Sequence, residues 1–95
     1  MEVFVYILYS SSKDRFYIGS TKDLARRLEI HNSGGYKDSS THYTSDWEIY
    51  YSLLCKSRSQ AIQIEKHIKR MRNRVYFKNL KQYPEIGARL LKKYE

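Results

Sequence analysis

Residues 17–31, YIGSTKDLARRLEIH, join a short strand to a helix whose hydrophobic pattern is broken in the middle. Gly19 is expected to end the strand. The helix is expected to begin near Thr21 or Lys22, where a small polar side chain can cap it, and to run to about Asn32. The stretch therefore predicts a strand followed by a helix, and the rest of the fold can be read outward from it.

The break in the helix pattern is made by two polar side chains. Leu24 and Leu28 mark the stripe that should face a core, and Arg27 and His31 fall on the same stripe. Buried charges are costly unless they are paired or bind a metal. The pattern therefore favours either a structural role, such as an Arg27–Glu65 ion pair or an arginine reaching out to solvent, or a chemical site.

A hairpin precedes this helix. Residues 3–9, VFVYILY, are apolar or aromatic on both faces, which is typical of a central strand. A polar turn joins them to a second strand at 16–19. If the turn closes symmetrically, Leu8 lies opposite Tyr17, and Tyr6 then shares a sheet face with Tyr17.

The remaining elements complete an α+β domain. The pattern predicts a long loop at 32–46, a strand at 47–54, a helix over 57–71 opened by a Ser57-x-x-Gln60 capping box, and helices at 74–84 and 85–93. The second helix should bury Ala61, Ile64, Ile68 and Met71. The order β-β-α-β-α-α, with a short last helix, predicts an antiparallel sheet flanked by helices in one domain, 1–95.

Composition excludes several classes of protein. The 95 residues include one cysteine, Cys55, so an internal disulfide and a cysteine-based zinc site are excluded. No apolar run approaches the ~18 residues that would span a membrane, and the N-terminus does not resemble a signal peptide. A cytoplasmic protein without membrane contact is therefore expected.

The positive charge is concentrated in the last third of the chain. Residues 1–65 carry eight basic and eight acidic side chains, whereas residues 66–95 carry ten basic and two acidic ones. A one-sided basic field is typical of a protein that binds nucleic acid, although a solubilising helix surface would also explain it. The expected phosphate contacts are Lys66, Lys69, Arg70, Arg72, Arg74 and Lys78, and Tyr43 in the loop could stack on a base.

Five side chains together suggest phosphodiester hydrolysis: Tyr6, Tyr17, Arg27, His31 and Glu65. A hydroxyl or an imidazole can help to activate water, and a guanidinium can neutralise charge on the phosphate. A carboxylate can hold Mg²⁺, which prefers one or two protein oxygens together with water and substrate phosphate. A second carboxylate is not obvious nearby, which favours one metal ion.

The motifs VYI at 5–7, YIG at 17–19 and AIQIEKHIKRMR at 61–72 resemble those of a GIY-YIG nuclease domain. The resemblance extends over about 3–83 and is strongest to small single-domain bacterial members. It implies a three-stranded antiparallel sheet flanked by helices, and cleavage of DNA with a divalent metal, Mg²⁺ or Mn²⁺. The basic helical part at 66–95 would then lie beside the catalytic domain.

The resemblance also implies roles for the five residues. Tyr17 or Tyr6 would help to deprotonate water, with His31 assisting. Arg27 would hold the scissile phosphate, and Glu65 would bind the metal.

The sequence departs from the family pattern at two positions. Val5 stands where the first motif has its leading glycine, and this valine merely continues a strand. Ser20 follows YIG where some repair members carry a lysine, which removes one phosphate contact and argues against a repair-incision role.

Two functions follow from these features. The first is a metal-dependent DNA endonuclease that selects structure or strandedness rather than base sequence, because no recognition module is appended. The second is a non-catalytic module that binds DNA or RNA through the basic third. A protein-interaction domain would not explain the charge.

Overall fold

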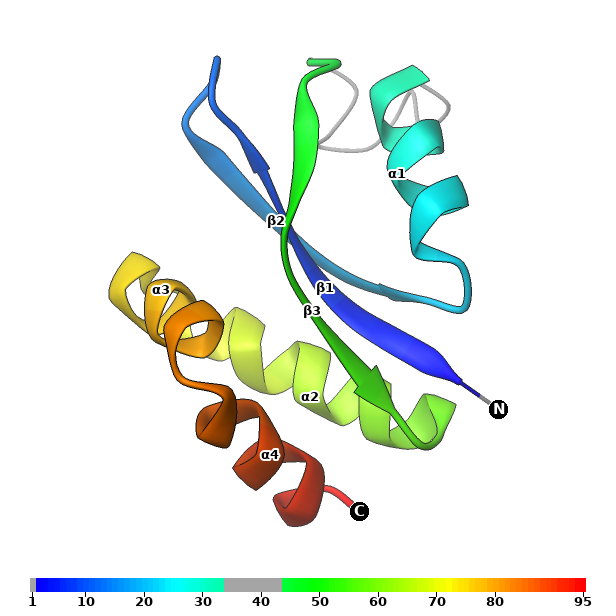
Figure 1. Ribbon diagram of the computed structural model, residues 1–95, viewed down its shortest axis with the longest axis vertical. Helices are drawn as coiled ribbons and strands as arrows, with labels where there is room; N and C mark the ends of the chain where they lie inside the picture. Colours follow the sequence, from blue (N-terminus) through cyan, green and yellow to red (C-terminus); the bar gives the residue numbers. More distant parts are fainter. Residues whose placement is uncertain (1, 34–43) are drawn as a thin grey trace.

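The computed structural model describes residues 2–33 and 44–95 (Figure 1). Three strands and four helices follow in the order β1 (Val3–Ser10), β2 (Arg15–Thr21), α1 (Leu24–Ser33), β3 (Trp47–Cys55), α2 (Arg58–Met71), α3 (Arg74–Gln82) and α4 (Pro84–Lys93). The predicted α+β class and the order of elements are confirmed. No helix in the described ranges is long and apolar enough to cross a membrane.

The sheet is antiparallel, with β1 in the centre and the order β2-β1-β3. Leu8 pairs with Tyr17, so the predicted register of the hairpin is confirmed. Strand β2 is longer than predicted, because it continues to Thr21 and pairs Gly19 with Tyr6. The expectation that Gly19 ends the strand is therefore wrong, and this glycine lies inside the ladder.

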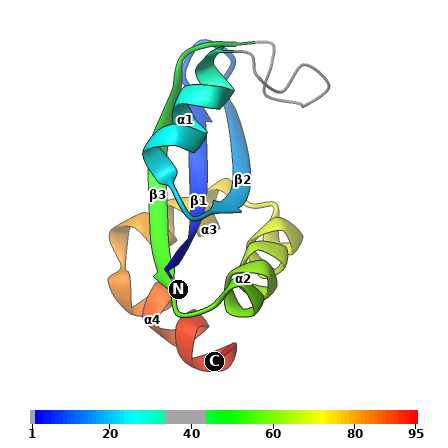
Figure 2. The same cartoon turned by 90° about the vertical axis from the view of Figure 1, so that its right-hand side faces the viewer.

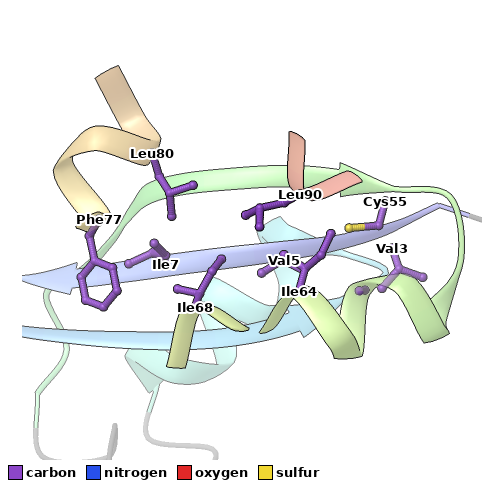
Figure 3. Close-up of a cluster of buried hydrophobic side chains, with 10 residues drawn as sticks. Val3, Val5, Ile7, Cys55, Ile64, Ile68, Phe77, Leu80 and Leu90 are labelled. Carbon is purple, nitrogen blue, oxygen red and sulfur yellow. The ribbon is translucent and has the colours of Figure 1, made fainter. Parts of the chain in front are cut away.

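The two faces of the sheet carry different helices (Figures 1 and 2). Val3, Val5 and Ile7 face α2, α3 and α4 and form the main core, shown in Figure 3. The alternate residues Tyr6 and Leu8 face α1 and form a smaller cluster. Because side chains of a strand alternate between faces, the apolar residues of β1 point into the main core, and Tyr6 points to the face that carries polar groups.

Helix α1 begins later than predicted and is fixed at both ends. Asp23 caps it by accepting a hydrogen bond from the backbone N–H of Arg26 at 3.1 Å, so the helix begins at Leu24 and not near residue 21 or 22. At the other end, the Asn32 amide accepts from the N–H of Trp47 at 2.7 Å and donates to its carbonyl at 3.0 Å. Asn32 thereby attaches α1 to the start of β3.

Helix α2 begins as its capping residues predict. The Ser57 hydroxyl accepts from the Gln60 N–H at 3.1 Å, but the Gln60 side chain accepts from the Lys56 N–H rather than completing the box at Ser57. The Gln60 amide also donates to the Leu91 carbonyl at 2.7 Å and so connects α2 to α4. Of the predicted apolar stripe, Met71 is 43% exposed and does not join the core.

The boundary between the last two helices lies before the predicted one. Helix α3 ends at Gln82, and Pro84 is the first residue of α4 rather than the last residue of α3. Proline is favoured at this position, where its missing N–H costs nothing. One turn later, Gly87 allows α4 to approach β3 closely. A Cβ atom at Gly87 would lie 2.5 Å from the Tyr51 hydroxyl and 3.1 Å from a Leu53 methyl.

This contact predicts that the effect of Gly87→Ala on the free energy of unfolding depends on the Tyr51 hydroxyl. Gly87→Ala should lower the free energy of unfolding by about 1 kcal/mol or more, because the methyl group overpacks against Tyr51. In a Tyr51→Phe background the hydroxyl is gone, and the higher helix propensity of alanine should make the same substitution neutral or stabilising by up to about 1 kcal/mol. Urea denaturation of the four proteins measures this. Equal effects in both backgrounds would contradict the described contact.

Candidate active site

Three of the predicted site residues meet where α1 packs on the hairpin. Tyr6 on β1 is 1% exposed, and its hydroxyl is hydrogen-bonded to His31 Nε2 on α1 at 3.2 Å. The Tyr17 ring on β2 lies 4.8 Å from the His31 ring and 6.3 Å from the Tyr6 ring, between centroids. Tyr6 is buried and Tyr17 only partly buried, so Tyr17 is the tyrosine that a substrate can reach.

Gly19 makes this arrangement possible. A Cβ atom at residue 19 would lie 2.6 Å from the Tyr6 hydroxyl and 3.2 Å from the Tyr17 ring. The Tyr6 ring therefore lies directly over the backbone of β2, where no side chain fits. The glycine of the YIG motif has a packing role that the sequence pattern did not reveal.

The environment of His31 keeps its ring neutral. His31 is 1% exposed, and burial, together with the smaller effect of the Arg27 charge, lowers the pKa of its imidazole to about 4. A neutral imidazole has one nitrogen able to accept a proton, so Nε2 can accept the hydrogen bond of the Tyr6 hydroxyl. His31 is therefore uncharged at neutral pH and acts there as a hydrogen-bond acceptor, while its low pKa makes it a weak base.

Arg27 lies one turn before His31 on α1. Its side chain is partly buried and borders a hollow of about 310 Å³ together with Ser20 and Arg58. Ser20 follows Gly19 directly, so this hollow adjoins the strand that carries Tyr17. Arg27 is also near enough to His31 for its charge to lower the pKa of that imidazole. None of Tyr6, Tyr17 and His31 borders the hollow itself.

Glu65 comes from a different side of the molecule. It lies on α2, whose buried residues face β1 and β2 from the main core (Figure 2). Its ion-pair partner is Lys69, one turn further along α2 at 2.8 Å, and not Arg27. Because Lys69 borders a hollow together with Tyr17, this row of α2 faces the edge of β2.

The donor set around Glu65 suits a hard divalent ion only when substrate is present. The Glu65 side chain is 20% exposed, so its carboxylate is accessible. Within residues 2–33 and 44–95, no group of three or more His, Cys, Asp or Glu side chains could hold a metal. One carboxylate is compatible with Mg²⁺, which commonly completes its octahedral shell with water and phosphate oxygens.

The predicted nucleic-acid contacts fall into two groups. Lys66, Lys69, Arg70, Arg72 and Lys78 are exposed on α2 and α3. Arg74 is engaged instead with the β1–β2 turn, where it donates to the Asp14 carboxylate at 2.8 Å and to the Asp14 carbonyl. Tyr43 lies outside the described residues.

Three comparisons relate this chain to known proteins. Residues 2–81 match the family model described as the GIY-YIG catalytic domain. A UPF0213 protein of Syntrophus aciditrophicus is 33% identical over 82 residues, which cover 86% of this chain and 93% of the relative. The solution NMR structure of a UPF0213 protein from Bacillus halodurans matches with a TM-score of 0.50 and 26% identity, over 84% of this chain and 82% of that one.

The position of Gly19 yields a stability prediction. Gly19→Ala should lower the free energy of unfolding by about 1–3 kcal/mol, because the new methyl group displaces the Tyr6 ring. Chemical denaturation measures this loss, with Ser20→Ala as a control at the neighbouring position. If Gly19→Ala is as stable as the control, the close approach of Tyr6 to β2 is not as described.

The burial of His31 yields a prediction on pH. Its folded pKa of about 4 lies below the unfolded value of 6.5, so the unfolded chain binds the proton first as pH falls. His31 should therefore stabilise the protein fully above pH ~6.5, and roughly 3 kcal/mol of that should be lost on acidification to about pH 4. The free energy of unfolding, measured by denaturation at several pH values, should depend more steeply on pH between about 4 and 6.5 in the wild type than in His31→Gln. Parallel curves would show that His31 does not titrate as described.

Proposed function

Because this chain belongs to the GIY-YIG family, we propose that it is an endonuclease that hydrolyses phosphodiester bonds of DNA with the help of one divalent metal ion. The observation that carries the proposal is the buried Tyr6–His31 hydrogen bond beside the accessible Tyr17. A protein that only binds nucleic acid has no need for a neutral histidine linked to two tyrosines next to an arginine.

The proposed role of each residue follows from how far its side chain is exposed and what it contacts. Tyr17 meets the attacking water or the phosphate, because Tyr6 is buried. Tyr6 holds His31 in place through their hydrogen bond, and the neutral His31 ring assists by packing against Tyr17 and so positioning it. Arg27 neutralises the charge that develops on the phosphate.

Glu65 is the residue that would hold the metal, Mg²⁺ or Mn²⁺. When bound, the ion supplies charge neutralisation at the phosphate and lowers the pKa of its water ligands. The Glu65 carboxylate must then exchange Lys69 for the ion, which is feasible because an exposed ion pair of this kind is worth only about 0.3–0.5 kcal/mol.

The substrate is selected by structure or strandedness rather than by base sequence. Base readout needs an element that enters a groove, and no helix beyond those packed on the sheet projects from the described residues (Figure 1). The exposed lysines and arginines of α2 and α3 contact phosphates, which carry no sequence information.

Cleavage of labelled DNA tests the proposal. Single-stranded, duplex and flap substrates are incubated with Mg²⁺, Mn²⁺ or EDTA. Arg27→Ala should reduce the rate by about 10²–10³-fold, the usual effect of removing one donor that stabilises a transition state. Arg26→Ala is the matched control, because Arg26 is exposed on the same helix. Glu65→Gln should abolish cleavage with either metal, because it removes the carboxylate that would hold the ion, and Glu85→Gln is its control.

Two outcomes would contradict the proposal. Cleavage that survives both Arg27→Ala and Glu65→Gln would mean that another site, or a contaminant, is responsible. Binding without cleavage of any substrate with either metal would instead favour the non-catalytic module, in which the basic third binds DNA or RNA.

A further inference from the structure

A second hollow lies at the free edge of the sheet and shares Tyr17 with the active site. It measures about 640 Å³ and is bordered by Arg15 and Tyr17 of β2, and by Lys69 and Arg72 at the end of α2. Strand β2 is an edge strand, so this side of the sheet is open to solvent. The hollow therefore continues from the active site toward the junction of α2 and α3.

The hollow carries more positive side chains than are neutralised by ion pairs within the described residues. Arg74 also borders it, but its guanidinium is taken up by Asp14 and stacks over the Phe16 ring at 5.2 Å. Lys69 is paired with Glu65, yet its side chain is 52% exposed and can turn toward a ligand. Arg15 and Arg72 are both exposed. After both ion pairs are counted, a net positive charge remains.

Arg72 is held in a backbone conformation that disfavours it. It caps the C-terminus of α2 with φ 41° and ψ 43°, the left-handed region in which glycine is the usual residue. A residue with a Cβ atom costs free energy there, and such costs are typically retained where a side chain serves function. The Arg72 side chain also borders a neighbouring hollow together with Lys69 and Arg70, so it is shared by both hollows.

We propose that this hollow binds a backbone phosphate of the nucleic acid next to the scissile one, with Arg72 as its principal contact and Arg15 and Lys69 in support. The location beside the scissile phosphate rests on the proposed function. Binding of the phosphate itself does not, because it needs neither metal nor cleavage.

Because the backbone of Arg72 is left-handed, its side chain can be removed without loss of stability, and an effect on binding can then be measured separately. Arg72→Gly should raise the melting temperature or leave it unchanged, because glycine is favoured at this φ. The same variant should weaken binding of a fluorescein-labelled single-stranded DNA oligonucleotide about tenfold in EDTA. The slope of log K against log salt should become shallower by about 0.7, the value for one phosphate contact on a single strand.

Two further variants complete the design. Arg72→Asn also tolerates the left-handed conformation and should weaken binding in the same way, which keeps the test valid if Arg72→Gly folds poorly. Lys92→Ala removes one positive charge from α4, away from the hollow, and should bind nearly as the wild type does. If both Arg72 variants bind and respond to salt like Lys92→Ala, the proposed phosphate site is overturned.

Cleavage measured on the same proteins distinguishes this site from the proposed activity. If the Arg72 variants lose binding while the wild type never cleaves, the phosphate site is supported and the nuclease assignment fails. If the wild type cleaves and the Arg72 variants bind and cleave as well as it does, the nuclease assignment stands and the phosphate site fails.

Discussion

The close approach of Tyr6 to Gly19 is the constraint on which the site depends. Because residue 19 has no side chain, the Tyr6 ring can lie across β2 and reach His31 on α1. The His31 ring in turn lies against Tyr17, so two strands and one helix are joined through a single histidine. Asn32, the next residue along α1, then fixes this end of the helix to β3 through the backbone of Trp47.

The two faces of the central strand β1 carry different sets of side chains, one in the main core and one at the candidate site. Val3, Val5 and Ile7 bury an apolar core under α2, α3 and α4 (Figure 3). Tyr6, on the opposite face of β1, contributes to the site. The tyrosine–histidine cluster therefore lies outside the main hydrophobic core. At the edge of β2, Tyr17 from the face that carries α1 borders the same hollow as the basic end of α2.

Local patterns predicted most of the fold but not the contacts that shape the site. The apolar run of β1, which predicts a central strand, the symmetric turn and the Ser57 cap are short-range features, and each is confirmed. The packing of Tyr6 over Gly19 and the double hydrogen bond of Asn32 join residues far apart in the chain, so periodicity could not reveal them. Sequence also could not show that the helix of Glu65 packs on the face opposite the tyrosines.

The central claim is that Tyr17 acts in phosphodiester hydrolysis, and Tyr17→Phe tests it most directly. This substitution removes one hydroxyl and keeps the ring that packs against His31, so the fold should be unchanged. The rate of DNA cleavage with Mg²⁺ or Mn²⁺ should fall at least about 10²-fold, whereas Tyr83→Phe, at an exposed position, should leave it unchanged. A folded Tyr17→Phe protein that cleaves DNA as fast as the wild type would contradict the account.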